Sequence, residues 1–133
     1  MIVLDASALI EMLLQTPLAD RLMERAVDPS ERLHAPYLLD IEVTHALRRL
    51  VQLKAITAPR ASLALDDLSQ LLVERHAHQD LVPRIWALRD SLTAYDATYV
   101  VLAEGLGAPL LTCDGRLARS AGHLARIELI SDA

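Results

Sequence analysis

The chain has 133 residues, a length that suits one domain built around a single hydrophobic core. Hydrophobic residues make up 53% of it, which excludes a disordered chain, and the longest unbroken apolar run, residues 99–103, is too short to span a membrane. The 13 basic and 18 acidic residues give a net charge of −5, which excludes binding of nucleic acid through bulk positive charge.

Strand and helix signals alternate in the first half of the chain. Asp5 or Ser7 can cap the first helix, and Thr57 with Pro59 introduces the fourth. Apolar residues at helical spacing define the helix that follows Pro36. The expected elements are a strand at residues 1–4, a helix to residue 14, a helix over 16–28, a strand at 33–35, a helix from after residue 36 to 53, and a helix over 57–72.

The second half continues the alternation. Asp80 can cap a helix to about residue 89, and Thr93 can cap a helix over residues 94–106. That last helix is apolar nearly all round, so we expect it to lie sandwiched in the core, and Gly105 and Gly107 to end it. The remaining expected elements are a weak strand over 72–78, a strand over 109–113, a short helix after the Asp-Gly turn at 114–115, and a strand over 127–130.

Alternating strands and helices predict an α/β fold: a central parallel sheet of four to five short strands flanked by helices, forming a single domain over residues 1–133. In such folds ligands bind beyond the carboxyl ends of the strands, near the point where the strand order reverses. Acidic residues at those ends are therefore the candidates for a functional site.

Four carboxylates stand in such places: Asp5, Glu42, Asp96 and Asp114. Each also has a local explanation. Asp5 can simply cap its helix, Asp114 can belong to an Asp-Gly turn, and Asp96 can complete a capping box with Thr93. Glu42 can be a solvated helix residue.

Helix geometry weakens the local explanations for two of these residues. At 100° per residue, Glu42 lies about 110° from the centre of its helix's apolar stripe, at the border of the stripe, where a side chain can lean into a cleft. Asp96 shares a helix side with Tyr99, Val100 and Ala103, so a buried carboxylate there needs a partner.

Three blocks of sequence form a pattern with these acids. They are VLDASA at residues 3–8; Pro36 with EV at 42–43 and AL at 46–47; and YDA at 95–97, AE at 103–104, APLLTCD at 108–114 and LA at 117–118. In these blocks the chain resembles the PIN-domain ribonucleases, in particular the VapC-type toxins of bacterial toxin–antitoxin modules. The resemblance spans nearly the whole chain and implies a PIN-like fold.

The resemblance implies that Asp5, Glu42, Asp96 and Asp114 bind metal, accompanied by the hydroxyl residues Ser7 and Thr112. Gly115 departs from the pattern, since relatives commonly carry a bulkier polar residue there. The resemblance further implies a metal-dependent endoribonuclease that cleaves RNA phosphodiesters, is the toxin of a type II pair, is neutralised by a cognate antitoxin and forms a homodimer.

Charge supports a metal independently. Two carboxylates about 5 Å apart repel by roughly 3 kcal/mol at an effective dielectric near 20, so an acid cluster requires a cation. Ligands that are all oxygen select a hard ion, Mg²⁺ or Mn²⁺, which also bridges an acidic protein to an RNA phosphate. Glu42 can ligate this ion or act as the base that positions the water.

Three other functions fit the chain less well. A haloacid-type hydrolase needs a second acid after the first strand, where this chain has Ser7. A receiver domain needs a lysine after one of its later strands, and the single lysine of this chain is Lys54. A non-catalytic PIN-like module that binds RNA or protein stays open. Manganese stabilisation that depends on the acids would discriminate against it.

Histidines, the single cysteine and several arginines are further candidates for a site. His76 and His78 would share one face of a strand as a metal pair, but no third ligand is apparent, which favours a surface or structural role. Cys113 in an apolar strand is expected in the core. Arginines close to the site acids are candidates for phosphate contacts, against solvated charge or a partner contact: Arg48, Arg49, Arg116 and Arg119.

The compartment follows from two features. The segment before the first apolar stretch has no basic residues and Asp5 follows at once, which is unlike a secretory signal. The single Cys113 forms no internal disulfide, as in a reducing compartment. We therefore expect a cytoplasmic protein without a membrane anchor.

Overall fold

A five-stranded parallel sheet forms the centre of the fold, with strand order β3-β2-β1-β4-β5. The computed structural model describes residues 1–26, 28 and 30–132. The strands are β1 Ile2–Leu4, β2 Leu33–Pro36, β3 Val73–His76, β4 Leu110–Thr112 and β5 Ile127–Leu129. The α/β class and the expected four to five short parallel strands are confirmed.

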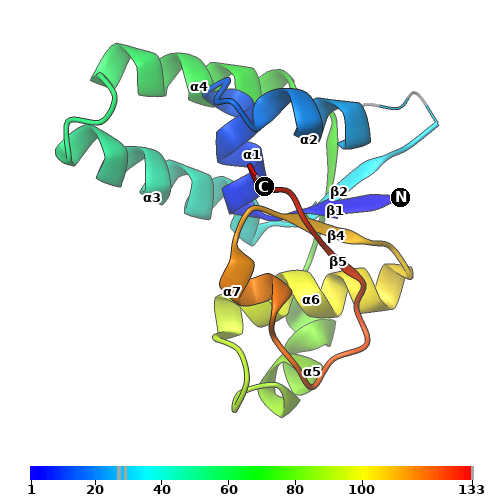
Figure 1. The fold of residues 1–133 in the computed structure, drawn as a ribbon. Coiled ribbons are helices and arrows are strands. Elements are labelled where there is room, and N and C mark those ends of the chain that lie inside the picture. Colours follow the sequence, from blue (N-terminus) through cyan, green and yellow to red (C-terminus); the bar gives the residue numbers. More distant parts are fainter. Residues whose placement is uncertain (27, 29, 133) are drawn as a thin grey trace.

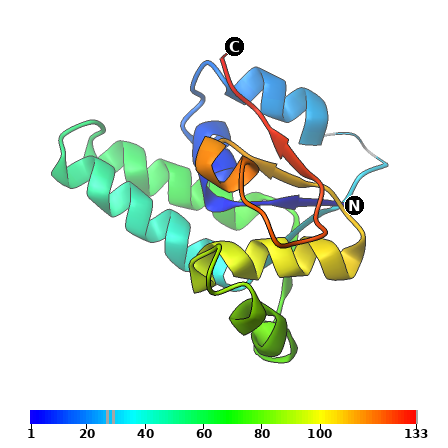
Figure 2. The ribbon, with the colours of Figure 1, turned by 60° about the horizontal axis from the view of Figure 1, so that its bottom comes forward.

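Helices cover both faces of this sheet (Figure 1). They are α1 Ala6–Leu13, α2 Ala19–Ala26, α3 Leu38–Gln52, α4 Ala58–Gln70, the 3₁₀ helix η1 Gln79–Leu81, α5 Val82–Ala87, α6 Ala94–Leu106 and α7 Gly115–Ala118. In Figure 1, α1 and α2 lie above the sheet and α5 and α6 lie below it. Helices α3 and α4 pack as a hairpin that projects beyond the carboxyl ends of the strands, as the second view also shows (Figure 2).

The core lies where β1 meets α6. All residues of β1 are buried, as are residues 97–103 of α6, because this helix packs against β1, β2 and β4 on one side and against α5 on another. The expectation that the apolar helix over 94–106 is sandwiched is confirmed. Within the described residues, no helix combines the length and the apolar character needed to cross a membrane.

Helix ends agree with the sequence signals in most places and differ in three. Thr93 caps α6 by accepting from the Asp96 N–H, and Gly107 ends it with φ 62°, a left-handed conformation that suits glycine. Gly105, expected to help end this helix, lies inside it. Asp80 caps no helix, since it lies within η1, whose N-cap is His78. Helix α2 begins three residues later than expected, after a turn at 17–18.

The strand order reverses between β1 and β4. From β1 the chain proceeds to β2 and β3 on one side, whereas β4 and β5 extend the sheet on the other. Strands on the two sides of this reversal send their connections away from each other, which leaves a crevice at the carboxyl ends of β1 and β4. Asp5 directly follows β1 and Asp114 closely follows β4, so the topology places both beside this crevice.

Candidate active site

Asp5 is a buried carboxylate held by three donors. It is the N-cap of α1, and its Oδ1 accepts from the Ala8 N–H at 2.9 Å and from the Ser7 hydroxyl at 2.7 Å, while Oδ2 accepts from the Thr112 hydroxyl. Burial raises the pKa of Asp5, and the bonds from Thr112, Ala8 and Ser7 act against that rise. Asp5 therefore caps its helix and also faces the crevice. The two interpretations of this residue are compatible.

Ser7 and Thr112 join the end of β4 to the start of α1. Their hydroxyl oxygens lie 3.2 Å apart, the Cys113 N–H donates to Ser7 Oγ at 3.0 Å, and the Asp114 N–H donates to Thr112 Oγ1 at 3.0 Å. This network brings Asp114 near Asp5, so that the charge of Asp114 contributes to the raised pKa of Asp5. The two hydroxyls thus support the acid site as the resemblance implies.

Arg116 bridges the other two aspartates. Its Nη2 lies 2.8 Å from Asp96 Oδ2 and 3.3 Å from Asp114 Oδ2. Asp114 is also the N-cap of α7 and accepts from the Arg116 N–H at 2.9 Å. The Arg116 side chain is 64% exposed, so water can readily solvate its guanidinium in place of the two carboxylates. A cation therefore already sits between these carboxylates, and it is a displaceable one.

The Asp96 carboxylate is thus engaged with Arg116. The backbone N–H of Asp96 donates to Thr93 Oγ1 at 3.2 Å, which is one of the two hydrogen bonds of the expected capping box. The carboxylate does not make the other one: it accepts from Arg116, which also donates to Asp114. This geometry favours the site interpretation of Asp96 over the capping one.

Glu42 has a carboxylate oxygen with unmet bonding capacity. Its Oε1 is buried and, like the neighbouring buried hydroxyl of Tyr99, makes no hydrogen bond of normal geometry with the described residues. Burial raises the pKa of Glu42, the hydroxyl of Tyr99 still acts against that rise as a hydrogen-bond donor, and the charges of Asp96 and Asp5 add to it. The Glu42 carboxylate therefore keeps an oxygen that can accept a further bond or bind a cation.

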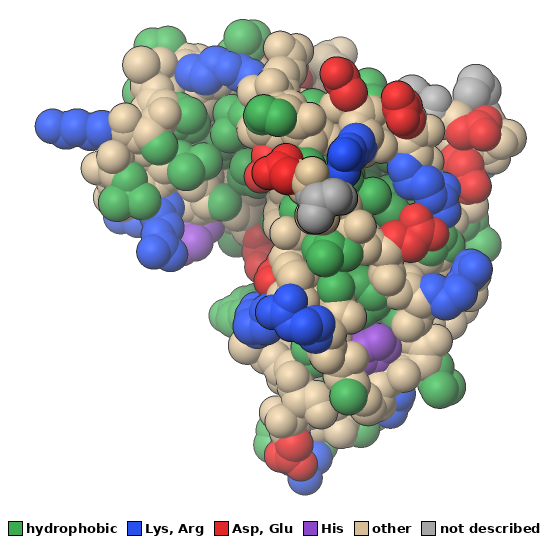
Figure 3. All heavy atoms as spheres, viewed as in Figure 1, with side chains coloured by type: hydrophobic (Ala, Val, Ile, Leu, Met, Phe, Trp, Pro, Cys, Tyr) green, Lys and Arg blue, Asp and Glu red, His purple; other side chains and the backbone are tan. Residues whose placement is uncertain are grey.

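The four acids lie near one another at a hollow of the molecular surface. Glu42 and Asp114 line this groove together with Ser7 and apolar residues of α1 and α3, while Asp5 and Asp96 act on Glu42 through their charges. Figure 3 shows the hollow between the α3–α4 hairpin and the part that carries α6 and α7, with acidic side chains inside it and basic side chains on both flanks. Carboxylates far apart in the chain therefore converge on one concave place.

This donor set fits a hard divalent cation. It offers carboxylate oxygens only, one of them buried without a partner and two of them already drawn to a positive charge. Mg²⁺ and Mn²⁺ prefer such oxygen ligands, keep several waters and tolerate few protein groups. Asp5, Asp96, Asp114 and Glu42 would hold such an ion after movement of their side chains, because among the described residues no three of them bring their oxygens within 4.8 Å of one another.

The other candidate residues from the sequence lie in different surroundings. Arg49 lines the groove, whereas Arg119 lies against Gly115, where an added Cβ would come within 2.9 Å of its Nη1. The glycine that departs from the family pattern thus makes room for Arg119. Cys113 lies just beyond β4 and is half-buried rather than in the core, and burial raises the pKa of its thiol to about 11.

The pairing of His76 with His78, which the sequence did not favour, does not form. His78 is exposed beyond the end of β3, whereas His76 Nε2 lies 2.9 Å from His34 Nδ1 on the neighbouring strand. The sequence reasoning missed His34 and Tyr99. Helical spacing from Asp96 pointed to Tyr99, but only the strand register brings His34 to His76.

The comparisons with known proteins identify the family. A profile of the PIN domain matches residues 2–122. Ribonuclease VapC12 of Mycobacterium tuberculosis is 43% identical over 131 residues, which cover 98% of this chain and 100% of that protein. The chain therefore belongs to the PIN-domain family and, within it, to the VapC-type proteins.

Solved structures share the fold. PAE2754 from Pyrobaculum aerophilum has a TM-score of 0.66 and 30% identity, with 88% of this chain and 83% of that chain covered. VapBC2 from Rickettsia felis, bound to a DNA fragment from their promoter, has a TM-score of 0.71 and covers 98% of this chain and 100% of that chain. At 13% identity the second likeness speaks for the fold alone.

Proposed function

We propose that this chain is an endoribonuclease that cleaves RNA phosphodiester bonds with Mg²⁺ or Mn²⁺, and that it is the toxin of a type II toxin–antitoxin pair acting in the cytoplasm. The observation that carries the proposal is the proximity of four carboxylates: Arg116 joins Asp96 to Asp114, the charge of Asp114 acts on Asp5, and the charges of Asp96 and Asp5 act on Glu42. The relative named Ribonuclease VapC12 supports the same reaction. A module that only binds RNA or protein has no need for such a repulsive cluster.

The residues divide the work as follows. Asp5, Asp96 and Asp114 would hold the ion, and the hydroxyls of Ser7 and Thr112 fix the orientation of the Asp5 carboxylate. Glu42 completes the set as a ligand or as the base that positions the attacking water. When bound, the ion lowers the pKa of a coordinated water and stabilises charge on the phosphoryl oxygens.

Arginines at the rim compensate for the acidic net charge. Arg49 lines the groove, and Arg116 stands at its edge with most of its side chain exposed. The Arg116 guanidinium, which is exposed and would be free of the two aspartates if they held an ion, is also suited to pair with an RNA phosphate. A chain with a net charge of −5 thereby binds a polyanion at one place.

Incubation of the purified protein with total cellular RNA tests the reaction. We expect new RNA ends in Mg²⁺ or Mn²⁺, and none with chelator or with Asp96→Asn. Asp66→Asn is the matched control, because it removes an exposed carboxylate on α4 outside the groove and should leave cleavage unchanged. Cleavage that persists in chelator, or in Asp96→Asn, would refute the proposed mechanism.

The groove also suits a protein partner. Its α3 wall carries the exposed apolar side chains of Ile41 and Leu53, 69% and 66% exposed, next to the acids. We propose that an antitoxin covers this wall and places an arginine against the carboxylates. Ile41→Glu should weaken capture by the co-expressed antitoxin, whereas Leu63→Glu, at an exposed apolar position of α4 outside the groove, should not.

The assembly state is proposed from the family resemblance. We propose that the chain forms a homodimer, and sedimentation equilibrium of the purified protein measures it. A mass of one chain across the concentration range would contradict the proposal.

A further inference from the structure

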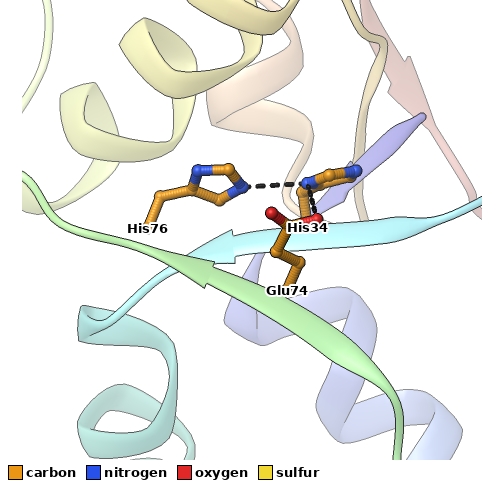
Figure 4. Close-up of side chains that lie close together, drawn as sticks. All are labelled: His34, Glu74 and His76. Atoms are coloured by element: carbon orange, nitrogen blue, oxygen red, sulfur yellow. Dashed lines mark hydrogen bonds and ion pairs between the residues drawn. The ribbon is translucent and has the colours of Figure 1, made fainter.

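A second group of metal-ligand side chains lies away from the acids, on strands β2 and β3. His34, Glu74 and His76 each offer a ligand atom, and these atoms lie within 4.8 Å of one another. The parallel register pairs His34 with Glu74, and side chains two apart on a strand share a face, so His76 joins them. Figure 4 shows the two imidazole rings and the carboxylate converging over this face of the sheet.

The distances are close to those of a coordination sphere. His34 Nδ1 lies 2.9 Å from His76 Nε2 and 3.7 Å from Glu74 Oε2. Ligand atoms bound at about 2.0–2.1 Å in a tetrahedron stand roughly 3.4 Å apart. The two observed distances lie on either side of that value, and the third, between Glu74 and His76, is below 4.8 Å, so modest side-chain movements would bring the three ligand atoms to one ion.

The group combines a buried ligand with an exposed one. The His34 side chain is 5% exposed, so the packing around it holds its ring in place. Glu74 is 57% exposed and leaves the group open to solvent on one side. An ion can therefore enter, and a water can take the fourth position.

The ligand types select the ion. Two imidazoles and one carboxylate form the three-ligand set typical of Zn²⁺, whereas Mg²⁺ prefers oxygen ligands alone. The other nitrogen of His34, Nε2, is buried with no hydrogen-bond partner among the described residues. Ligating histidines usually donate that second N–H, and loss of such a partner weakens affinity about 10–100-fold. Micromolar rather than nanomolar binding is expected.

We propose that His34, Glu74 and His76 form a Zn²⁺ site that ties the edge strand β3 to β2, separate from the acid cluster in both residues and chemistry. Strand β3 has a neighbour on one side only, β2, so its attachment to the sheet depends on that pairing. An ion with ligands on both strands adds a cross-link between them. Its binding should stabilise the folded chain without taking part in RNA cleavage.

Zinc binding to the full-length protein tests this proposal. Titrations are made in excess Mg²⁺, which occupies an oxygen-only site but does not compete for imidazole. We expect one Zn²⁺ per chain, a rise in melting temperature, and Co²⁺ absorption of the intense tetrahedral kind. Glu74→Gln and His76→Gln should each weaken Zn²⁺ binding at least tenfold, and Mg²⁺-dependent RNA cleavage should persist in Glu74→Gln.

His78→Gln is the matched control, since His78 is exposed just beyond the same strand and should leave Zn²⁺ binding unchanged. If His76→Gln does not fold, as circular dichroism reports, the exposed Glu74 carries the test alone. Absence of Zn²⁺ binding would mean that the histidines form only a hydrogen-bonded pair, and would overturn the proposal. Binding that Glu74→Gln leaves at full strength would overturn it as well.

Discussion

The Thr112 hydroxyl donates a hydrogen bond to Oδ2 of Asp5, which joins residues 107 positions apart at the ends of adjacent strands. The same hydroxyl oxygen accepts from the Asp114 N–H. One buried side chain therefore orients a carboxylate of the site on one strand and the backbone that carries another on the next. The same atom therefore links the carboxyl ends of β1 and β4 at the place where Asp5 and Asp114 lie.

Thr112→Val should remove this link while keeping the shape of the side chain. The Asp114 N–H loses its acceptor and Asp5 loses a donor, so we expect the free energy of unfolding to fall by about 1–2 kcal/mol. RNA cleavage should fall as well, because Asp5 is no longer held in place. Urea unfolding and the cleavage assay measure the two effects. Thr44→Val, at an exposed position of α3, is the control and should change stability by less than about 0.5 kcal/mol.

Asp96→Asn separates the site interpretation from the capping one in a thermal melt. Without metal, loss of the exposed Arg116 pair and relief of repulsion among the acids oppose each other, so stability should change by less than about 1 kcal/mol. Added Mn²⁺ should raise the melting temperature less than in the parent chain, since ligand stabilisation follows affinity. A destabilised variant with the full Mn²⁺ response would return Asp96 to a capping role.

Arg116→Gln should strengthen metal binding in the absence of RNA. The guanidinium stands between Asp96 and Asp114 and competes with an ion for their oxygens. Its removal should tighten Mn²⁺ binding roughly fivefold, equivalent to about 1 kcal/mol. Calorimetric titration measures this affinity. Arg119→Gln removes the same charge at the end of the same helix and should have a smaller effect, and equal effects would point to net charge alone.

The ion pair between Arg84 and Glu104 should make stability depend on pH. Arg84 and the Leu124 N–H hold the pKa of Glu104 below its usual value of 4.5. The stabilisation is therefore fully present above that usual value and is lost as pH falls through the lower pKa of the folded state. Glu104→Gln should cost roughly 1–2 kcal/mol near neutral pH and less in acid. Urea unfolding across acid pH checks it, and an equal loss at every pH would contradict the assignment.

Local signals in the sequence determined most of the elements. Thr93 as a cap, Gly107 as a stop and the apolar periodicity of α3 act within one or two turns of a helix, so they are readable without tertiary structure. Asp80 shows the limit of this reasoning. A capping residue type is a preference only, and the chain forms η1 across that position before α5 begins.

The four candidate acids could also be named in advance, because each follows a strand or borders an apolar helix stripe. Their contacts with other side chains could not be predicted from the sequence. The salt bridge of Arg116 with Asp96 and the convergence of His34 with His76 join residues that are 20 and 42 positions apart in the chain. The sequence by itself determined which side chains stand at strand ends, since that depends on local order. Only the tertiary structure decided which of them meet, because strand order and register bring together residues whose separation in the chain carries no such information.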